Sequence, residues 1–258
     1  MNEKNSLRFA FSRTVTRPSF IEMAPFLYQE SYGSAQIRGN ADLQNGYNYN
    51  IDLRYELFEK NGDMLSITAY YKHLKAPIER VQTLSGGSAV HSFRNADNGM
   101  ATGVEIEFRK EIVKDLRFGV NGSYMYTNVK LPEGGAYTNS QRALQGASPY
   151  LANADLTYSP AFSNDRQLSV ALLYNLQGPR IQSVGISDLG DIKQQPVHTL
   201  NFTGSYRFNR RFAVKLQVND LLNQDILFKQ EVPTTGDKVE VERFRKGTGF
   251  EVGFSYDL

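Results

Sequence analysis

The chain has 258 residues, a length that suits one large β domain or two smaller domains. Its 29 basic and 27 acidic residues are interspersed and leave a formal net charge of +2, which excludes a basic stripe for nucleic acid. It has no cysteine, which excludes disulfide frameworks and thiolate metal sites.

Apolar and polar residues alternate in about ten segments along the chain. A period of two is typical of half-buried strands, and no segment shows a competing helical period. The longest apolar stretches are far too short for a membrane-spanning helix, which needs about 20 residues. The sequence therefore predicts an all-β protein with strands at 7–15, 51–57, 65–71, 104–108, 116–126, 152–158, 168–176, 200–208, 212–218 and 250–258.

The connections between these segments alternate between short and long. The short turns lie at 59–63, 111–115, 160–166 and 209–211, and the long polar segments lie at 16–47, 74–100, 128–149, 178–198 and 219–247. Outer-membrane barrels have short periplasmic turns and longer extracellular loops. The pattern predicts an antiparallel transmembrane β-barrel of about ten meandering strands.

The apolar faces of the strands could meet a protein core or lipid, because a soluble barrel or sandwich also alternates. Small polar residues on the opposite faces suit a wet lumen and favour lipid outside. They are Ser66, Thr68, Asn121, Ser123, Ser169, Asn175, Asn201, Thr203 and Ser205. Aromatic residues beside the short turns fit an interfacial girdle, although they would also staple hairpins in a soluble β protein.

The first residues show no signal peptide, since "NEKNSLRF" follows Met1 without a basic or an apolar region. Either the chain is cytoplasmic or its front end is missing. The barrel pattern favours the second alternative.

Four stretches resemble the C-terminal barrel region of TonB-dependent outer-membrane receptors, particularly those of the Bacteroidetes type. They occur in the family's order and span nearly the whole chain: "SRTVTRPSFIEMAPF" (12–26), "GNADLQNGYNYNIDLRYELF" (39–58), "FRNADNGMATGVEIEFRKEI" (93–112) and "LQVNDLLNQDI" (216–226). The chain departs from the family pattern at Ala41 and Asn45, where prolines are usual, at Asp220, and at Leu258, where an aromatic residue is expected.

The resemblance implies a C-terminal part of a larger barrel over residues 1–258. The family's barrel has about 22 strands closed around an N-terminal plug, and this chain has room for neither the plug nor the earlier strands. The implied function is non-enzymatic: TonB-dependent uptake of a siderophore, vitamin or glycan across the outer membrane, with no cofactor. The implied partners are outer-membrane lipid, the ligand, and the TonB complex acting through the missing plug.

The alternative is a self-contained small barrel, either a passive pore or a hydrolase at the rim. His73, His91 and His198 are widely separated, so no metal site is predicted. His91 with Asp97 and His198 with Asp191 are the only His–Asp combinations, and neither lies in a recognisable catalytic motif. The glycine-rich segments 33–40 and 86–90 lack the strand-to-helix context of a phosphate-binding loop.

Four arginines lie where strands pass into the long segments: Arg17, Arg38, Arg94 and Arg180. Guanidinium groups bind anionic and oxygen-rich ligands, so these residues are the predicted ligand contacts. The alternative is that each one hydrates its loop or pairs with a nearby acidic residue.

Overall fold

The structure is a computed structural model of the chain and describes residues 4–30, 36–59, 61–85, 88–131, 141–162, 165–185 and 189–256, with backbone only at 82–85 and 88–89. Leu258 and parts of the glycine-rich segments 33–40 and 86–90 lie outside these ranges.

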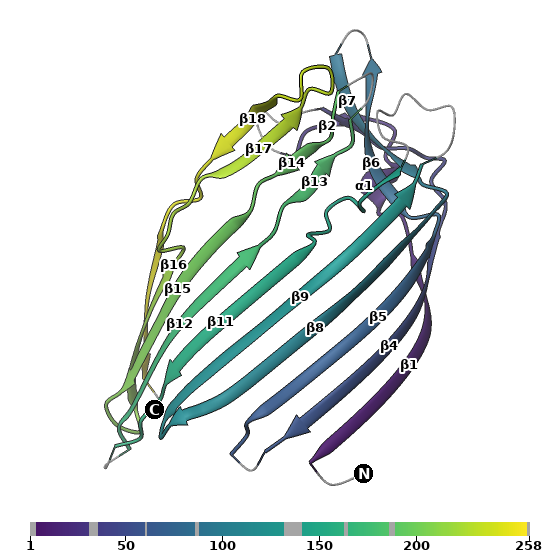
Figure 1. Cartoon of the computed structure of the whole chain (residues 1–258). Coiled ribbons are helices and arrows are strands. Elements are labelled where there is room, and N and C mark those ends of the chain that lie inside the picture. The colour runs from purple at the N-terminus through teal and green to yellow at the C-terminus, as the bar shows by residue number, and fades with distance from the viewer. Residues whose placement is uncertain are drawn as a thin grey trace.

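Ten strands form one antiparallel meander, in which each strand pairs with the next (Figure 1). In order they are β1 (Asn5–Thr16), β4 (Gly46–Phe58), β5 (Met64–Lys75), β8 (Asn98–Val113), β9 (Leu116–Lys130), β11 (Tyr150–Tyr158), β12 (Gln167–Gln177), β15 (Val197–Arg207), β16 (Phe212–Asn219) and β19 (Gly249–Tyr256). The two-residue strand β10 (Gln141–Arg142) pairs antiparallel with the last two residues of β9, Val129 and Lys130. The predicted all-β meander is confirmed, and the short turns and both termini lie at the lower end.

The outward face of this wall carries its apolar residues. The register aligns them in rows across neighbouring strands, and one row consists of Phe9, Leu53, Ala69, Val104 and Tyr124. Phe9, Tyr124 and Phe250 are 71%, 64% and 75% exposed. Water would make so much bare apolar surface unfavourable, and a bilayer removes that cost. The predicted apolar exterior is therefore present.

The inward face is polar and more deeply buried, because side chains on the concave side of a curved sheet converge. Glu56 is 4% exposed; its carboxylate accepts from Arg54 at 2.9 Å and forms an ion pair with Arg8 at 3.1 Å. Farther along the wall, Asn175 donates to Asn153 at 2.5 Å and Asn153 to Asn121 at 2.7 Å. These pairings connect polar side chains of the inner face on five of the ten strands, although Glu56 Oε2 has no hydrogen-bond partner among the described residues.

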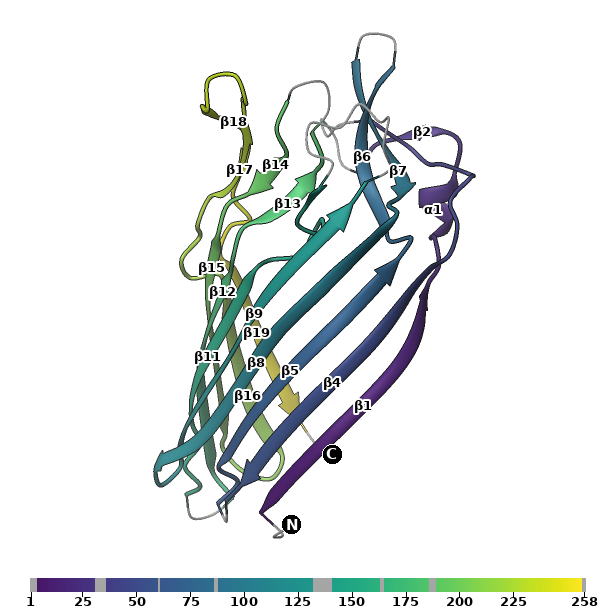
Figure 2. The same cartoon turned by 45° about the vertical axis from the view of Figure 1, so that its right-hand side comes forward.

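The long connections fold into two small sheets above the wall (Figure 2). The first loop sheet has the order β2 (Leu27–Tyr28), β3 (Ile37–Arg38), β7 (Ser88–Asn95) and β6 (Ile78–Ser85). The second has the order β13 (Arg180–Ser183), β14 (Ile192–Gln194), β17 (Ile226–Glu231) and β18 (Lys238–Phe244). The sequence predicted only polar connections here, so these strands are an addition to the predicted fold.

One short helix occurs in the described part of the chain, α1 (Phe20–Met23), after β1. The Ser19 hydroxyl accepts from the Glu22 backbone N–H, and the Glu22 carboxylate accepts from the Ser19 backbone N–H, so this capping box satisfies two of the free donors. No described helix has the length and apolarity needed to cross a membrane.

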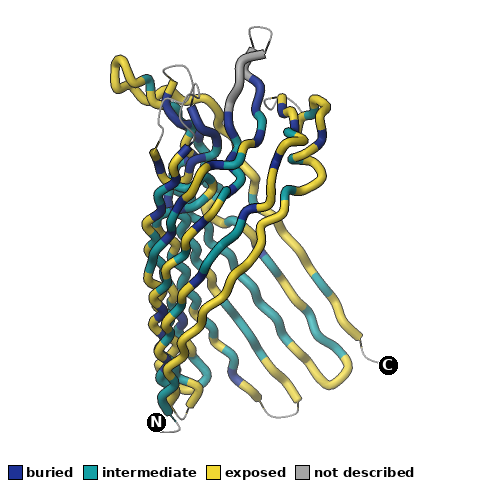
Figure 3. The backbone as a smooth tube through the Cα atoms, turned by 90° about the vertical axis from the view of Figure 1, so that its right-hand side faces the viewer, coloured by how far each residue is buried: buried dark blue, intermediate teal, exposed yellow. Residues whose placement is uncertain are grey.

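The wall is an open trough in the described residues (Figure 3). The strand β1 pairs with β4 alone and β19 with β16 alone, so each leaves one edge without a strand partner in this part of the chain.

Candidate functional site

The candidate site lies at the mouth, where the two loop sheets meet above β9. Val81 of β6 and Val184, directly after β13, form a parallel bridge. Val184 also packs with Ala96, Val129 and Leu131 in a small buried core. This apolar contact fixes the two loop sheets to each other and to the wall.

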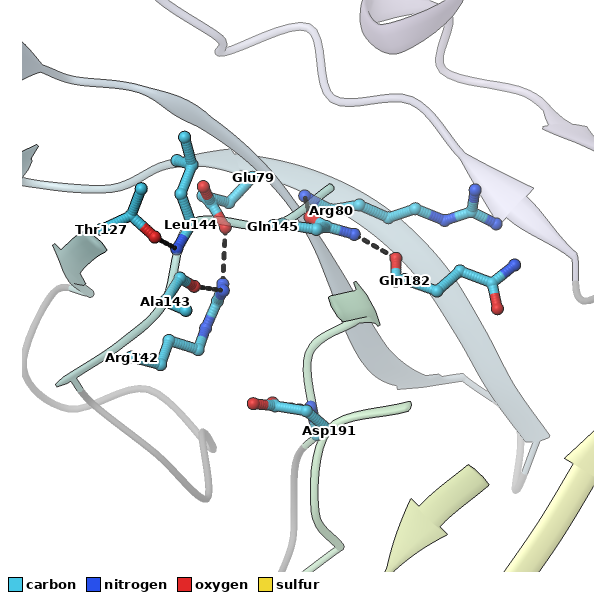
Figure 4. A network of polar contacts seen from close by, with 10 residues as sticks. Glu79, Arg80, Thr127, Arg142, Ala143, Leu144, Gln145, Gln182 and Asp191 are labelled. Atoms are coloured by element: carbon cyan, nitrogen blue, oxygen red, sulfur yellow. Dashed lines mark hydrogen bonds and ion pairs between the residues drawn. The ribbon is translucent and has the colours of Figure 1, made fainter. Parts of the chain in front are cut away.

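A buried ion pair connects β6 to β10 (Figure 4). The Arg142 guanidinium donates to Glu79 at 2.7 Å, and the two side chains are 3% and 1% exposed. Burial raises the pKa of the Glu79 carboxyl, and Arg142 opposes that rise by attracting the charged form. Glu79 Oε1 and Arg142 Nε have no hydrogen-bond partner among the described residues, so the pair is held by one good contact.

The segment after Arg142 bridges both loop sheets (Figure 4). Gln145 accepts from the Arg80 backbone N–H at 2.5 Å and donates to the Gln182 carbonyl. The Gly146 N–H donates to the Ile181 carbonyl at 2.9 Å. Gly146 has a φ of +74°, a left-handed conformation that glycine adopts without strain. The glycine therefore lets the turn reach the edge of β13.

His91 lies between Arg80 and Ser183 and is 7% exposed. Arg80 Nε donates to His91 Nδ1 at 2.8 Å, which places the ring proton of neutral His91 on Nε2. Nε2, 3.4 Å from Ser183 Oγ, then donates to the hydroxyl and cannot take its proton. Burial, with Arg80 nearby, lowers the His91 pKa to about 4. The arrangement is a structural contact between the loop sheets and does not activate Ser183.

The second His–Asp combination, His198 with Asp191, is also not supported, because each residue contacts another partner in the described residues. Asp191 accepts from the Gly185 backbone N–H at 3.0 Å, and His198 contacts the Tyr174 hydroxyl at 2.5 Å. No described group of three or more His, Asp or Glu side chains is placed to hold a metal ion.

A pocket of about 360 Å³ separates the two loop sheets. Its apolar lining comes from Ile78, Phe93, Ile181 and Phe228. Its polar lining is rich in hydrogen-bond donors and comprises Arg80, Gln145, Arg180, Gln182 and Gln194, with one carboxylate from Glu22. That carboxylate already accepts from the Ser19 backbone and hydroxyl. The pocket can therefore hold a ligand with an apolar or planar body and several acceptor oxygens.

A second pocket, of about 620 Å³, lies between the upper end of β9 and β13–β14. Its charged lining residues are Arg142, Arg180, Asp191 and Lys193, and it is bordered by Tyr124 and Tyr126, which belong to the outward-facing rows. Because Arg142 is already paired with Glu79, Arg180 and Lys193 against Asp191 leave a small positive excess, which favours an anionic group.

The four predicted arginines do not converge. Arg180 lines both pockets and donates to Gln194 at 2.7 Å. Arg38 and Arg94 lie exposed in the first loop sheet, and Arg17 lies exposed directly after β1. These three line neither pocket.

The sequence missed Arg80, Gln145, Gln182 and Gln194. No periodic pattern marks the stretch 78–81, in which Ile78 and Arg80 line the pocket while Glu79 and Val81 are buried. Their roles depend on contacts between segments that are far apart in the chain.

Comparison with solved structures gives the same fold over nearly the whole chain. A mutant ferric enterobactin receptor from Pseudomonas aeruginosa, solved with enterobactin, has 18% identity and a TM-score of 0.64 over 99% of this chain and 39% of that chain. The siderophore receptor PirA from Pseudomonas aeruginosa has 16% identity and a TM-score of 0.60, covering 100% of this chain and 40% of that chain. The copper transporter OprC has 14% identity and a TM-score of 0.65, covering 99% and 37%.

The chain thus spans 37% to 40% of the length of these proteins. At such identities the likeness concerns the fold alone. A search of curated proteins finds no significant match.

The sequence model of one family, described as the outer membrane protein beta-barrel family, matches residues 1–256. The match agrees with the ten-strand meander and its apolar exterior. This chain therefore belongs to the outer membrane protein beta-barrel family and is an outer-membrane protein.

Proposed function

We propose that the chain is the C-terminal part of a receptor barrel that takes up a siderophore, vitamin or glycan by TonB-dependent transport. One observation carries this proposal: a donor-rich pocket lies between structured loops, at the mouth of a wall that resembles the barrels of siderophore receptors and a copper transporter. The loops capture the ligand in this proposal, and the wall lines its path.

The free edges of β1 and β19 support a larger barrel. Each unsatisfied backbone group in hydrocarbon costs several kcal/mol, so membrane sheets close. In our proposal, further strands of the same polypeptide, outside this chain, complete the wall. The proposal also includes a plug inside the barrel and the TonB complex, which acts on the plug.

Arg180 is the leading ligand contact because it lines both pockets. Arg17, Arg38 and Arg94 are proposed as outer contacts that attract an anionic or oxygen-rich ligand to the mouth. This role suits their exposed positions and requires no contact among them.

The test measures uptake by cells that make the native protein and by cells that lack it. The probes are radiolabelled ferric enterobactin, copper(II), cobalamin and a labelled oligosaccharide, each with and without a protonophore. We expect protein-dependent accumulation of one probe that the protonophore abolishes, because energy from the inner membrane drives the transport.

Glutamine variants of Arg180, Arg17, Arg38 and Arg94 test the contacts, and Lys110→Gln at the short-turn end serves as the control. We expect Arg180→Gln to raise the half-saturating concentration of the probe most, by about tenfold, the value of one charge-assisted hydrogen bond. Protein-dependent uptake that persists with the protonophore would identify a passive pore and overturn the proposal.

A further inference from the structure

The outward face of the wall changes character abruptly near the mouth. The row Phe11, Ile51, Tyr71, Thr102 and Tyr126 continues the apolar band. The next row toward the mouth is Arg13, Tyr49, His73, Met100 and Asn128, and the row beyond it is Val15, Tyr47, Lys75, Asn98 and Lys130. Charges thus begin where the apolar band ends, which is the level of the lipid headgroups.

All the charges in these two rows are positive: Arg13, Lys75 and Lys130, with no acidic residue. The Arg13 guanidinium lies over the Tyr47 ring at 4.3 Å and near the Tyr49 ring at 5.7 Å. Cation–π stacking uses the face of the guanidinium and leaves its N–H edge available to an acceptor. Arg13, His73 and Lys75 are all exposed.

The other end of the same strands has a different charge pattern. Lys4 and Glu59 form an ion pair there at 2.9 Å, so charges of both signs meet near the short turns. Among these five strands, the two outward rows nearest the mouth carry positive charges only, whereas both signs are present near the short turns.

We propose that the cationic rim, defined as Arg13, Tyr47, Tyr49, His73 and Lys75, binds lipids in the outer leaflet whose phosphate groups give the headgroup a net negative charge. Phosphate oxygens accept hydrogen bonds from the free edge of Arg13 and from the Lys75 ammonium. The tyrosine rings fill the boundary between acyl chains and headgroups. A lipid is the fitting partner because the rim borders directly on the apolar band that lies in the membrane.

Neighbouring strands are about 4.8 Å apart and residues along a strand about 3.4 Å apart, so the Cα atoms of Arg13 and Lys75 lie roughly 12 Å apart. One phosphorylated headgroup can therefore reach both long side chains. The inference rests on the outer-membrane location of the chain and is independent of the proposed uptake function.

The test uses the native protein, purified in detergent and examined by native mass spectrometry. The probes are phosphatidic acid and phosphatidylcholine with identical acyl chains, added in equal amounts. We expect the protein to retain phosphatidic acid in clear excess. Arg13→Gln and Lys75→Gln should each reduce that preference about fivefold, and the double variant should abolish it.

Lys110→Gln is the matched control, since Lys110 is an exposed cation of β8 at the short-turn end. It should leave the preference unchanged. Heat-modifiable migration on gels verifies that each variant still forms a folded barrel. Inorganic phosphate at millimolar concentration should not displace the lipid, because the acyl chains contribute to binding.

Three results would overturn the proposal: a folded double variant that keeps the preference, an equal loss in Lys110→Gln, or displacement of the lipid by inorganic phosphate. None of these results bears on uptake, so this inference and the proposed function fail separately.

Discussion

At the scale of single residues, the mouth depends on the ion pair between Glu79 and Arg142. Removing one partner of a buried pair leaves the other charged and unpaired, which costs about 3–5 kcal/mol. We expect Glu79→Ala to open the mouth locally and to speed hydrogen exchange of β6 amides by about a hundredfold or more. Hydrogen exchange with mass spectrometry measures this change.

A double variant, Glu79→Leu with Arg142→Met, is the matched control because it removes both charges and keeps the volume. It should recover most of the protection, since apolar side chains of similar size replace buried ion pairs well. Exchange as fast in the double variant as in Glu79→Ala would contradict this account of the pair.

His91 makes the same region sensitive to acid. Its pKa is about 4 in the folded protein and 6.5 ordinarily, so the folded state disfavours the proton that an opened state binds. Neutral His91 contributes up to about 3 kcal/mol to the stability of the folded state. This contribution is fully present above pH 6.5 and is lost as the pH falls toward 4. We expect β7 and β13 to lose exchange protection across this range, after correction for intrinsic rates.

The His91→Gln variant keeps a hydrogen-bond donor near Ser183, but glutamine does not titrate. The exchange protection of β7 and β13 should therefore vary less with pH in this variant. An equal pH dependence in this variant would assign the effect to another group.

At the scale of strands, the account requires lipid on one face and water on the other. Ile106 is 50% exposed on the outward face of β8, and Ser123 lies on the inward face of β9 opposite Glu105. Arginine on the lipid face near the bilayer midplane costs about 2–4 kcal/mol. We expect Ile106→Arg to lower the urea midpoint of unfolding from lipid vesicles, whereas Ser123→Arg should have little effect, because it faces water and Glu105.

A larger loss from Ser123→Arg than from Ile106→Arg would mean that the assignment of the two faces is reversed.

The sequence predicted all ten strands of the wall because the bilayer imposes an alternation that every spanning strand must obey. It underestimated the length of β8, which begins at Asn98 and not at residue 104, because the first residues of that strand do not alternate between apolar and polar. It missed both loop sheets, because the side chains buried there include Glu79, His91 and Ser183. Such residues are buried through partners on other segments, and one strand read alone carries no sign of them.

The candidate site was predictable to a smaller extent. Arg180 reaches the pockets because it begins β13, three residues after the end of β12, as the pattern of strand ends suggests. The His91–Asp97 and His198–Asp191 combinations rest on proximity in sequence alone, and each histidine has other contacts in the described residues. Nearness along a chain is a poor guide where hairpins bring distant segments together.

At the scale of the whole molecule, the open trough is the main physical constraint. Two strand edges in hydrocarbon would leave rows of backbone groups unsatisfied, at several kcal/mol for each group. The wall must close on strands from elsewhere in the polypeptide, or these strands must close on one another. Our account takes the first course, because the chain spans about two fifths of the two receptors with the same fold.

The most direct test is the mass of the native polypeptide in outer-membrane fractions, found by mass spectrometry of peptides from β1 to β19. The account predicts a polypeptide far larger than 29.1 kDa, with these strands in its C-terminal part. A native product of 29.1 kDa that forms a closed barrel would contradict it and would favour a small pore.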